Sequence, residues 1–285
     1  MITSFQCYAN DKESKLVYYN SLIPKDVELR ERILTGVYCD DVSTIQKCAE
    51  AGQMVFADGK NYQVMHNGIK ILPDSYYGKW MTLLIQFLQG HHEPQEERVF
   101  FEVLKSIPPG ATMLELGSYW GYYSLWFKKE IPDAKTYLIE PDDKNLQIGK
   151  EHFLCNHYEG DFTHAMIGSS SIEEAPFTNW DYEISNIKQV CIDDFVEEKQ
   201  IPFIHILHSD IQGAEVDMLK GCQKLIREKR VGYFFVSTHR GTHEPCLRAF
   251  ENSEYEILLS FTREESFSAD GLIIAKSPDY NGHTT

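Results

Sequence analysis

The segment Met113–Ser124 most constrains how this 285-residue chain can fold. It reads M-L-E-L-G-S-Y-W-G-Y-Y-S, an apolar run followed by Gly117 and Gly121, after which a helical pattern begins. A second apolar run, Tyr137–Ile139, ends in Glu140. A strand, a glycine turn, a helix and a second strand ending in an acid form the unit in which α/β proteins hold adenosine-containing cofactors.

From residue 111 onward the apolar pattern alternates between strand and helix. Strands are predicted at 112–116, 135–139, 162–167, 203–208, 232–237, 255–261 and 271–275, with a further edge strand at 187–191. Helices are predicted at 122–129, 144–156, 192–198, 214–227 and 245–251, and an irregular acidic loop at 169–185. Alternation of this kind implies a mostly parallel sheet with right-handed crossovers.

The last two strands have no helix between them, so they should pair as an antiparallel hairpin. The predicted fold class is therefore α/β, a doubly wound, mostly parallel, seven-stranded Rossmann-like sheet with an antiparallel C-terminal hairpin. This arrangement resembles the class I methyltransferase architecture.

Residues 1–90 do not alternate cleanly, and we interpret them as an N-terminal α+β extension. Short helices are predicted at 26–34 and 42–51, strands at 54–57 and 62–65 around an Asp58-Gly59 turn, and an amphipathic helix at 77–88. Residues 91–285 form the predicted cofactor-binding domain, whose first helix opens at His91-His92-Glu93-Pro94. We expect the extension to cap the acceptor site or to make a homodimer contact.

The charge balance and the cysteines narrow the function class. The net charge of −16 comes from 27 basic and 43 acidic residues without a Lys/Arg-rich run, so nucleic acid and anionic membranes are not the expected partners. Seven widely spaced cysteines without C-x-x-C indicate reduced thiols. An apolar signal core is missing from residues 1–15, and no apolar run approaches the roughly 18 residues of a membrane span. We expect a soluble, cytoplasmic protein.

The glycine spacing distinguishes between adenosine cofactors. A nicotinamide-binding turn reads G-x-G-x-x-G, whereas Gly117 and Gly121 are four residues apart and enclose Tyr119 and Trp120. These bulky side chains would crowd a pyrophosphate, which S-adenosylmethionine lacks. The pattern therefore favours S-adenosylmethionine.

The predicted cofactor contacts come from the ends of three strands. Glu115 is placed to meet the ammonium group of the cofactor, and Glu140, 19 residues after Gly121, to accept both ribose hydroxyls. The end of the third strand should flank the adenine. The full predicted set is Glu115, Gly117, Ser118, Tyr119, Gly121, Glu140, Pro141, Asp142, Ile167 and Gly168.

Three blocks together resemble the FkbM-type methyltransferase family. The first is E-L-G-S-Y-W-G-Y-Y-S at 115–124, and the second is E-P-D at 140–142. The third begins with D-I-Q-G-A-E at Asp210 and continues to Gly221. The resemblance covers roughly residues 95–240, and a bacterial subgroup shares the H-E-P-Q-E-E segment at 92–97. It implies O-methylation of a hydroxyl on a sugar, a glycan or a secondary metabolite. The chain departs from many members at Gln212, where they have an acid, and at Ser237-Thr238-His239, where they have a glutamate followed by histidine.

Methyl transfer to an alcohol needs a group that takes the hydroxyl proton. Asp210 and His239 end two neighbouring strands and should face the same crevice as the cofactor, because ligands of open α/β sheets bind beyond the carboxyl ends of the strands. His208 shares a side with Asp210. Which of the three is the base stays open, and Asp210 is also a candidate N-cap for the helix that begins near Gly213. A divalent metal at these residues is an alternative, but no metal ligand is predicted.

The acceptor contacts are predicted at Trp120, Glu96 and Gln212. Two other functions remain open at this stage. One is an NAD(P)-dependent oxidoreductase on a Rossmann-like fold, against which the missing third glycine argues. The other is a non-catalytic module that binds S-adenosylmethionine.

Overall fold

The computed structural model describes residue 36 and residues 39–179, 181–268 and 270–282. The helix predicted at 26–34 lies outside these ranges. The chain divides into two compact units, Met1–Phe101 with Phe267–Ala269, and Glu102–Ser266 with Asp270–Thr285. Each unit is described by itself.

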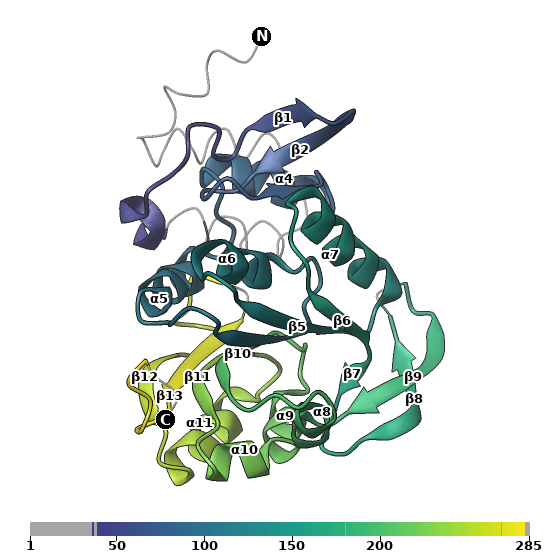
Figure 1. The fold of residues 1–285 in the computed structure, drawn as a ribbon, viewed down its shortest axis with the longest axis vertical. Helices are drawn as coiled ribbons and strands as arrows, with labels where there is room; N and C mark the ends of the chain where they lie inside the picture. Colours follow the sequence, from purple (N-terminus) through teal and green to yellow (C-terminus); the bar gives the residue numbers. More distant parts are fainter. Residues whose placement is uncertain (1–35, 37–38, 180, 269, 283–285) are drawn as a thin grey trace. The chain divides into compact units, whose positions relative to one another are not determined.

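A seven-stranded sheet forms the framework of the second unit (Figure 1). Its strands are β4 Thr112–Leu116, β5 Lys135–Glu140, β6 Asp161–His164, β10 Ile204–Ser209, β11 Val231–Thr238, β12 Glu256–Phe261 and β13 Gly271–Lys276. Their order is β12-β13-β11-β10-β4-β5-β6. The first five strands in chain order run parallel to one another, and β13 runs antiparallel to both β11 and β12. The predicted fold, including the antiparallel C-terminal hairpin, is confirmed.

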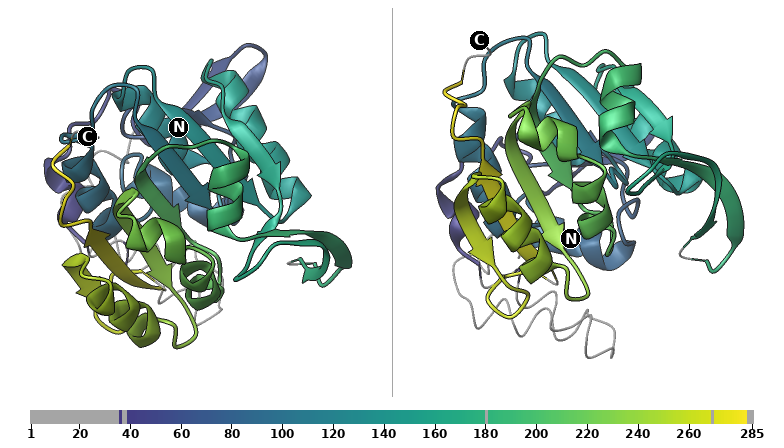
Figure 2. Two further views of the ribbon diagram at one scale, coloured as in Figure 1. Left: turned by 60° about the horizontal axis from the view of Figure 1, so that its bottom comes forward. Right: turned by 90° about the horizontal axis from the view of Figure 1, so that it is seen from below.

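Helices cover both faces of this sheet (Figures 1 and 2). One face carries α6 Tyr122–Glu130 and α7 Asp143–Cys155, and the other carries α8 Ile192–Glu198, α9 Glu215–Lys220, α10 Gln223–Arg227 and α11 His243–Asn252. The pleat of β4 decides which side chains face each layer. Leu114 and Leu116 enter the hydrophobic core beneath α8–α11, whereas Glu115 points to the α6 side and hydrogen-bonds that helix. The helix predicted at 214–227 is divided in two, because Gly221 and Cys222 interrupt it.

The largest error of the sequence prediction lies at 169–185, where an irregular loop was expected. Here β8 Ile172–Thr178 pairs antiparallel with β9 Ile184–Val190, and β9 pairs with β7 Met166–Ile167 in a separate three-stranded sheet. This hairpin projects from the main sheet (Figure 2). Only Ala175 of β8 is buried, so the strand exposes both faces and lacks the alternation by which a half-buried strand is recognised.

The N-terminal unit contains a small antiparallel sheet and a helix. Its elements are η1 Asp41–Thr44, β1 Met54–Ala57, β2 Lys60–Val64, β3 Lys70–Ile71, α4 Lys79–Phe87 and the start of α5 Pro94–Leu104. The Asp58-Gly59 turn is confirmed, with both residues at positive φ (52° and 77°). The helix predicted at 42–51 is wrong, and only η1 forms there. The amide of Cys48 donates to His66 O instead of closing a helical turn.

None of the helices formed by the described residues has the length and apolarity that a membrane crossing requires. The cysteines of the described residues are thiols outside any disulfide: Cys39, Cys48, Cys155, Cys191, Cys222 and Cys246.

Candidate active site

The loop between β4 and α6 makes a close backbone contact with the end of β10. Gly117 has φ +66°, and a Cβ atom built on it would lie 1.9 Å from Asp210 O and 2.9 Å from Asp210 C. The Asp210 amide donates to Leu116 O over 3.0 Å, which fixes the two strand ends beside each other. Only glycine fits this position, since any side chain would collide with the β10 backbone.

The remainder of the loop presents polar backbone and one buried hydroxyl. Gly121 has φ +71° and lies at the start of α6. Tyr119 has φ 44°, a left-handed conformation that is uncommon for a bulky residue. The side chain of Ser118 is buried, and its Oγ has no hydrogen-bond partner among the described residues. A buried hydroxyl without a partner is costly, so this atom is suited to contact a ligand.

Glu140 ties this loop to the start of α7. Its Oε2 accepts from Tyr119 N (2.8 Å) and its Oε1 from Asp142 N (3.0 Å). Burial raises the pKa of Glu140 to about 7, although these hydrogen bonds act in the opposite direction. A carboxylate offers about four acceptor positions, and the Asn145 side chain also hydrogen-bonds Glu140, so at least one position remains for a ligand hydroxyl.

Glu115 has a different environment from the one we expected. It is buried in β4, and its Oε2 accepts from Ser124 N over 3.0 Å, which satisfies one of the free amides at the start of α6. Burial raises the pKa of this carboxyl. The observed contact holds α6 to β4, and no ammonium contact is needed to explain the residue.

The other predicted cofactor residues lie at the ends of β5 and β7. Asp142 caps α7 by accepting from Lys144 N and Asn145 N. Pro141 O contacts His164 Nε2 at 2.8 Å. Ile167 lies in the hydrophobic core, and a Cβ on Gly168 would lie 2.4 Å from the side chain of Gln189.

Four side chains converge on His239, which follows the end of β11. Its Nδ1 lies 2.8 Å from Glu215 Oε1, and its Nε2 lies 3.1 Å from Asp270 Oδ1 and 3.3 Å from Asp210 Oδ1. Gln212 Nε2 donates to Asp210 Oδ1 (2.9 Å) and lies 3.0 Å from His239 Nε2. The predicted convergence of Asp210 and His239 is thus present in the structure.

The three carboxylates determine the charge of His239. Burial alone would lower its pKa, but hydrogen bonds to Asp270 and Glu215 and the charge of Asp210 raise the pKa to about 10. His239 is therefore an imidazolium at neutral pH, and a doubly protonated ring has no lone pair with which to act as a base.

Asp270 is the member of this cluster that the sequence analysis missed. It immediately precedes β13 and belongs to no motif, so only the antiparallel return of β13 beside β11 brings it to His239. The expected capping role of Asp210 is wrong. The N-cap of α9 is Ala214 without a side-chain bond, and Gly213 N donates to Glu215 instead.

His208 and Trp120 are packed in the interior of the second unit. His208 is 4% exposed, with its ring 4.2 Å from that of Tyr123 and 6.4 Å from that of Phe235. Trp120 is 3% exposed and packs against Tyr122 at 5.3 Å. These surroundings are typical of core residues. Glu96 lies in the other unit, in the first turn of α5.

Comparisons with known proteins identify the family. The family model of the methyltransferase FkbM domain matches residues 115–267, more than half of the chain. A search of curated proteins found no match.

Similar solved structures include TrmK from M. capricolum (13% identity, TM-score 0.40, covering 66% of this chain and 71% of that one). An rRNA methylase from Streptococcus thermophilus matches at 8% identity and a TM-score of 0.45, covering 63% of this chain and 93% of that one. A putative SAM-dependent methyltransferase from Streptococcus mutans matches at 15% identity and a TM-score of 0.42, covering 81% of this chain and 56% of that one.

The residues of the loop fit S-adenosylmethionine. Gly117 has no side chain to obstruct a ligand at the strand ends, and the buried Ser118 Oγ has no hydrogen-bond partner among the described residues. Glu140 keeps at least one open acceptor position. The chain belongs to the FkbM methyltransferase family, and it is an S-adenosylmethionine-dependent methyltransferase.

Proposed function

We propose that this enzyme methylates a hydroxyl group of a sugar, a glycan or a small secondary metabolite. The observation that carries the proposal is the position of Asp210. Its backbone oxygen touches Gly117 of the cofactor loop, and its carboxylate is held by Gln212 and by the His239 imidazolium. A carboxylate beside the methyl donor is suited to an alcohol acceptor, which must lose a proton during the reaction.

Asp210 is the proposed proton acceptor. S-adenosylmethionine supplies a methyl group bound to a positively charged sulfur. The hydroxyl proton of the acceptor becomes strongly acidic only as the new carbon–oxygen bond forms, so a carboxylate of ordinary basicity can receive it. Of the three candidates for the base, His239 is unsuitable because its pKa is about 10, and His208 is buried between aromatic rings.

His239 is the proposed positioning residue for Asp210. Its Nε2 is shared between Asp210 and Asp270, while its Nδ1 is fixed by Glu215, which is fully buried. Contacts to both ring nitrogens fix the orientation of the ring. The imidazolium charge also offsets the electrostatic repulsion among the three nearby carboxylates. The arrangement favours one orientation of the Asp210 carboxylate.

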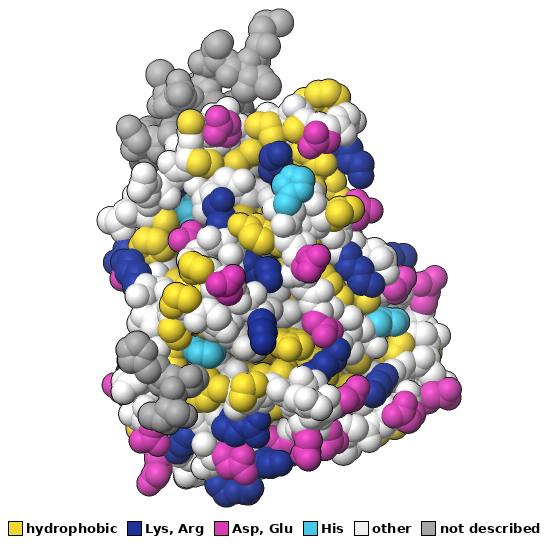
Figure 3. Space-filling view, viewed as in Figure 1, with side chains coloured by type: hydrophobic (Ala, Val, Ile, Leu, Met, Phe, Trp, Pro, Cys, Tyr) yellow, Lys and Arg dark blue, Asp and Glu magenta, His cyan; other side chains and the backbone are white. Residues whose placement is uncertain are grey.

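Ser118 and Glu140 are the proposed donor contacts. The Ser118 hydroxyl bonds the amino-acid end of S-adenosylmethionine, and Glu140 accepts the ribose hydroxyls through the lone pairs that Tyr119 N and Asp142 N leave open. We also propose a neutral or small acceptor in preference to a polyanion. On the face drawn in Figure 3, the basic side chains of the described residues are scattered among acidic ones and form no continuous basic area.

The test measures transfer of a tritiated methyl group from S-adenosylmethionine to a panel of sugars, oligosaccharides and hydroxylated metabolites. A labelled product that withstands alkali and carries the methyl group on oxygen is an ether and supports the proposal, whereas an alkali-labile ester or a labelled amine contradicts it. Asp210→Asn should lower kcat by about 10²-fold or more, the usual contribution of a general base. The matched control is Asp217→Asn, since Asp217 is an exposed residue of α9 that pairs with Lys220. Equal activity of the two variants would exclude Asp210 as the base.

A further inference from the structure

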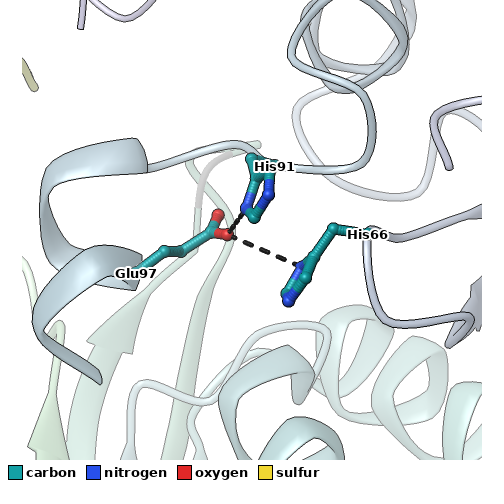
Figure 4. A group of neighbouring side chains, drawn as sticks. All are labelled: His66, His91 and Glu97. Atoms are coloured by element: carbon teal, nitrogen blue, oxygen red, sulfur yellow. Dashed lines mark hydrogen bonds and ion pairs between the residues drawn. The ribbon is translucent and has the colours of Figure 1, made fainter. Parts of the chain in front are cut away.

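A second cluster of chemically active side chains lies entirely within the N-terminal unit. It consists of His66 in the turn after β2, His91 in the segment before α5, and Glu97 in α5 (Figure 4). The side chains of His91 and Glu97 have no exposed surface, and that of His66 is 3% exposed. The proposed methyl-transfer site uses none of the three.

The donor atoms of these residues point toward one another. One ligand atom from each residue lies within 4.8 Å of the other two. Glu97 Oε2 hydrogen-bonds His91 Nδ1 and lies 4.0 Å from His66 Nδ1 (Figure 4). Bonds from zinc to histidine and carboxylate are about 2.0–2.1 Å, so two ligand atoms of a tetrahedral ion are roughly 3.3 Å apart. The observed separations differ from this value by amounts that side-chain rotation can supply.

We propose that His66, His91 and Glu97 bind one Zn²⁺ ion. Two imidazoles and one carboxylate are a donor set that suits zinc, whereas Mg²⁺ and Ca²⁺ prefer oxygen ligands alone. Binding replaces the hydrogen bond between His91 and Glu97, and the proton that they share leaves to solvent. The two histidine rings, stacked at 4.1 Å, separate so that both nitrogens face the ion.

Several features prepare the three residues for this role. The side chain of His66 is 3% exposed and its ring stacks on that of His91 at 4.1 Å, so both imidazoles lie beside the Glu97 carboxylate. The other carboxylate oxygen of Glu97 accepts from His92 N (2.8 Å) and Glu93 N (3.1 Å), which fixes the carboxylate. Metal-binding carboxylates are commonly oriented by such additional hydrogen bonds. His91 Nε2 is buried and has no hydrogen-bond partner among the described residues, so hydrogen bonding within the unit leaves this ring incompletely satisfied.

The position of the site indicates its role. His66 lies in the turn between β2 and β3, where its amide donates to Gly90 O, and Glu97 lies in α5. One ion would cross-link these segments of the N-terminal unit. Burial of the three side chains separates the ligand atoms from bulk solvent and substrate. A single enclosed water would complete the four-coordinate site, and the ion would stabilise the unit.

The test uses the full-length chain without a histidine tag. After removal of metals with a chelator, the protein is loaded with Zn²⁺, dialysed against metal-free buffer and analysed for metal content. We expect one zinc per chain. In the Co²⁺-loaded protein we expect visible absorption bands typical of nitrogen and oxygen ligands in a four-coordinate site. A wild-type protein that retains no zinc overturns the proposal.

His66→Asn is the decisive variant, because the His91–Glu97 hydrogen bond does not depend on His66. Since the loss of a residue that merely orients a ligand lowers metal affinity about 10–100-fold, loss of a ligand should lower zinc affinity by about 100-fold or more. His157→Ala, which removes an exposed histidine of the second unit, should retain the wild-type affinity. Equal affinity in His66→Asn and wild type, or several weak zinc ions in all three proteins, shows adventitious binding and overturns the proposal. If His66→Asn does not fold, the absorption bands of the Co²⁺-loaded wild type decide.

Discussion

The close contact between Gly117 and the end of β10 can be tested with one added methyl group. In Gly117→Ala the new Cβ would lie 1.9 Å from Asp210 O, a distance that no real contact reaches, so the β4–α6 loop must move away from β10. Both ends of this contact belong to the proposed site. The substitution should therefore damage stability and methyl-donor binding together.

The loss of stability has two parts. A residue other than glycine at φ +66° costs about 1–2 kcal/mol, and forcing an extra carbon into a packed position costs about 1–3 kcal/mol more. Gly110→Ala is the matched control, since Gly110 has φ +75° in the same unit but nothing within 4 Å of its Cβ position. Gly110→Ala should show only the cost of a residue other than glycine at positive φ. The difference in stability between the two variants measures the free-energy cost of the close contact at Gly117.

Thermal unfolding followed by circular dichroism checks the stability, and calorimetric titration with S-adenosylmethionine checks the affinity. Each kcal/mol should lower Tm by roughly 2–4 °C in a domain of this size. We expect Gly117→Ala to melt below Gly110→Ala by an amount that corresponds to about 1–3 kcal/mol, and to bind the donor more weakly. If the two variants melt together and both bind the donor as the wild type does, the inferred backbone contact is incorrect.

Three further outcomes follow from the charges of the site. Because the pKa of Glu140 is about 7, donor affinity should rise between pH 6 and 8 as this carboxylate ionises. In Glu140→Gln, calorimetry should show a flat profile and roughly 10–100-fold weaker binding. His239 has a folded-state pKa of about 10, above its ordinary value of 6.5. Protonated His239 therefore stabilises the folded protein fully below pH 6.5, and this stabilisation is lost as the pH rises toward 10. His239→Asn should lower the free energy of unfolding at pH 6 by about 3 kcal/mol or more and flatten this decline in urea titrations. In Asp270→Asn the free energy of unfolding should decline at a lower pH than in the wild type, since Asp270 supplies one of the hydrogen bonds that raise the pKa of His239.

Local sequence patterns were sufficient for most of the sheet. β4 was predicted at its observed bounds because it is a short apolar run that ends at Gly117. α8 was also predicted at its observed bounds, because its buried residues Ile192, Phe195 and Val196 follow the helical spacing. The hydrophobic pattern did not predict the correct secondary structure in segments whose burial is unusual. β8 exposes both of its faces, and the polar stretch at 42–51 bonds through Cys48 to His66 instead of forming a helix.

The sequence by itself determined the fold, the family and the methyl donor. The glycine spacing at 117–121, the acid at the end of the next strand and the strand–helix alternation are all local features, and each follows from the backbone geometry of a few neighbouring residues. These features do not depend on how distant segments meet.

Only the tertiary structure decided what the charged groups do. The sequence left open which of Asp210, His208 and His239 is the base. Folding surrounds His239 with Asp210, Glu215 and Asp270 and raises its pKa to about 10. It likewise brings His66 to Glu97, 31 positions later in the chain. Such assignments depend on burial and on charges from segments far apart in the sequence, which no local pattern records.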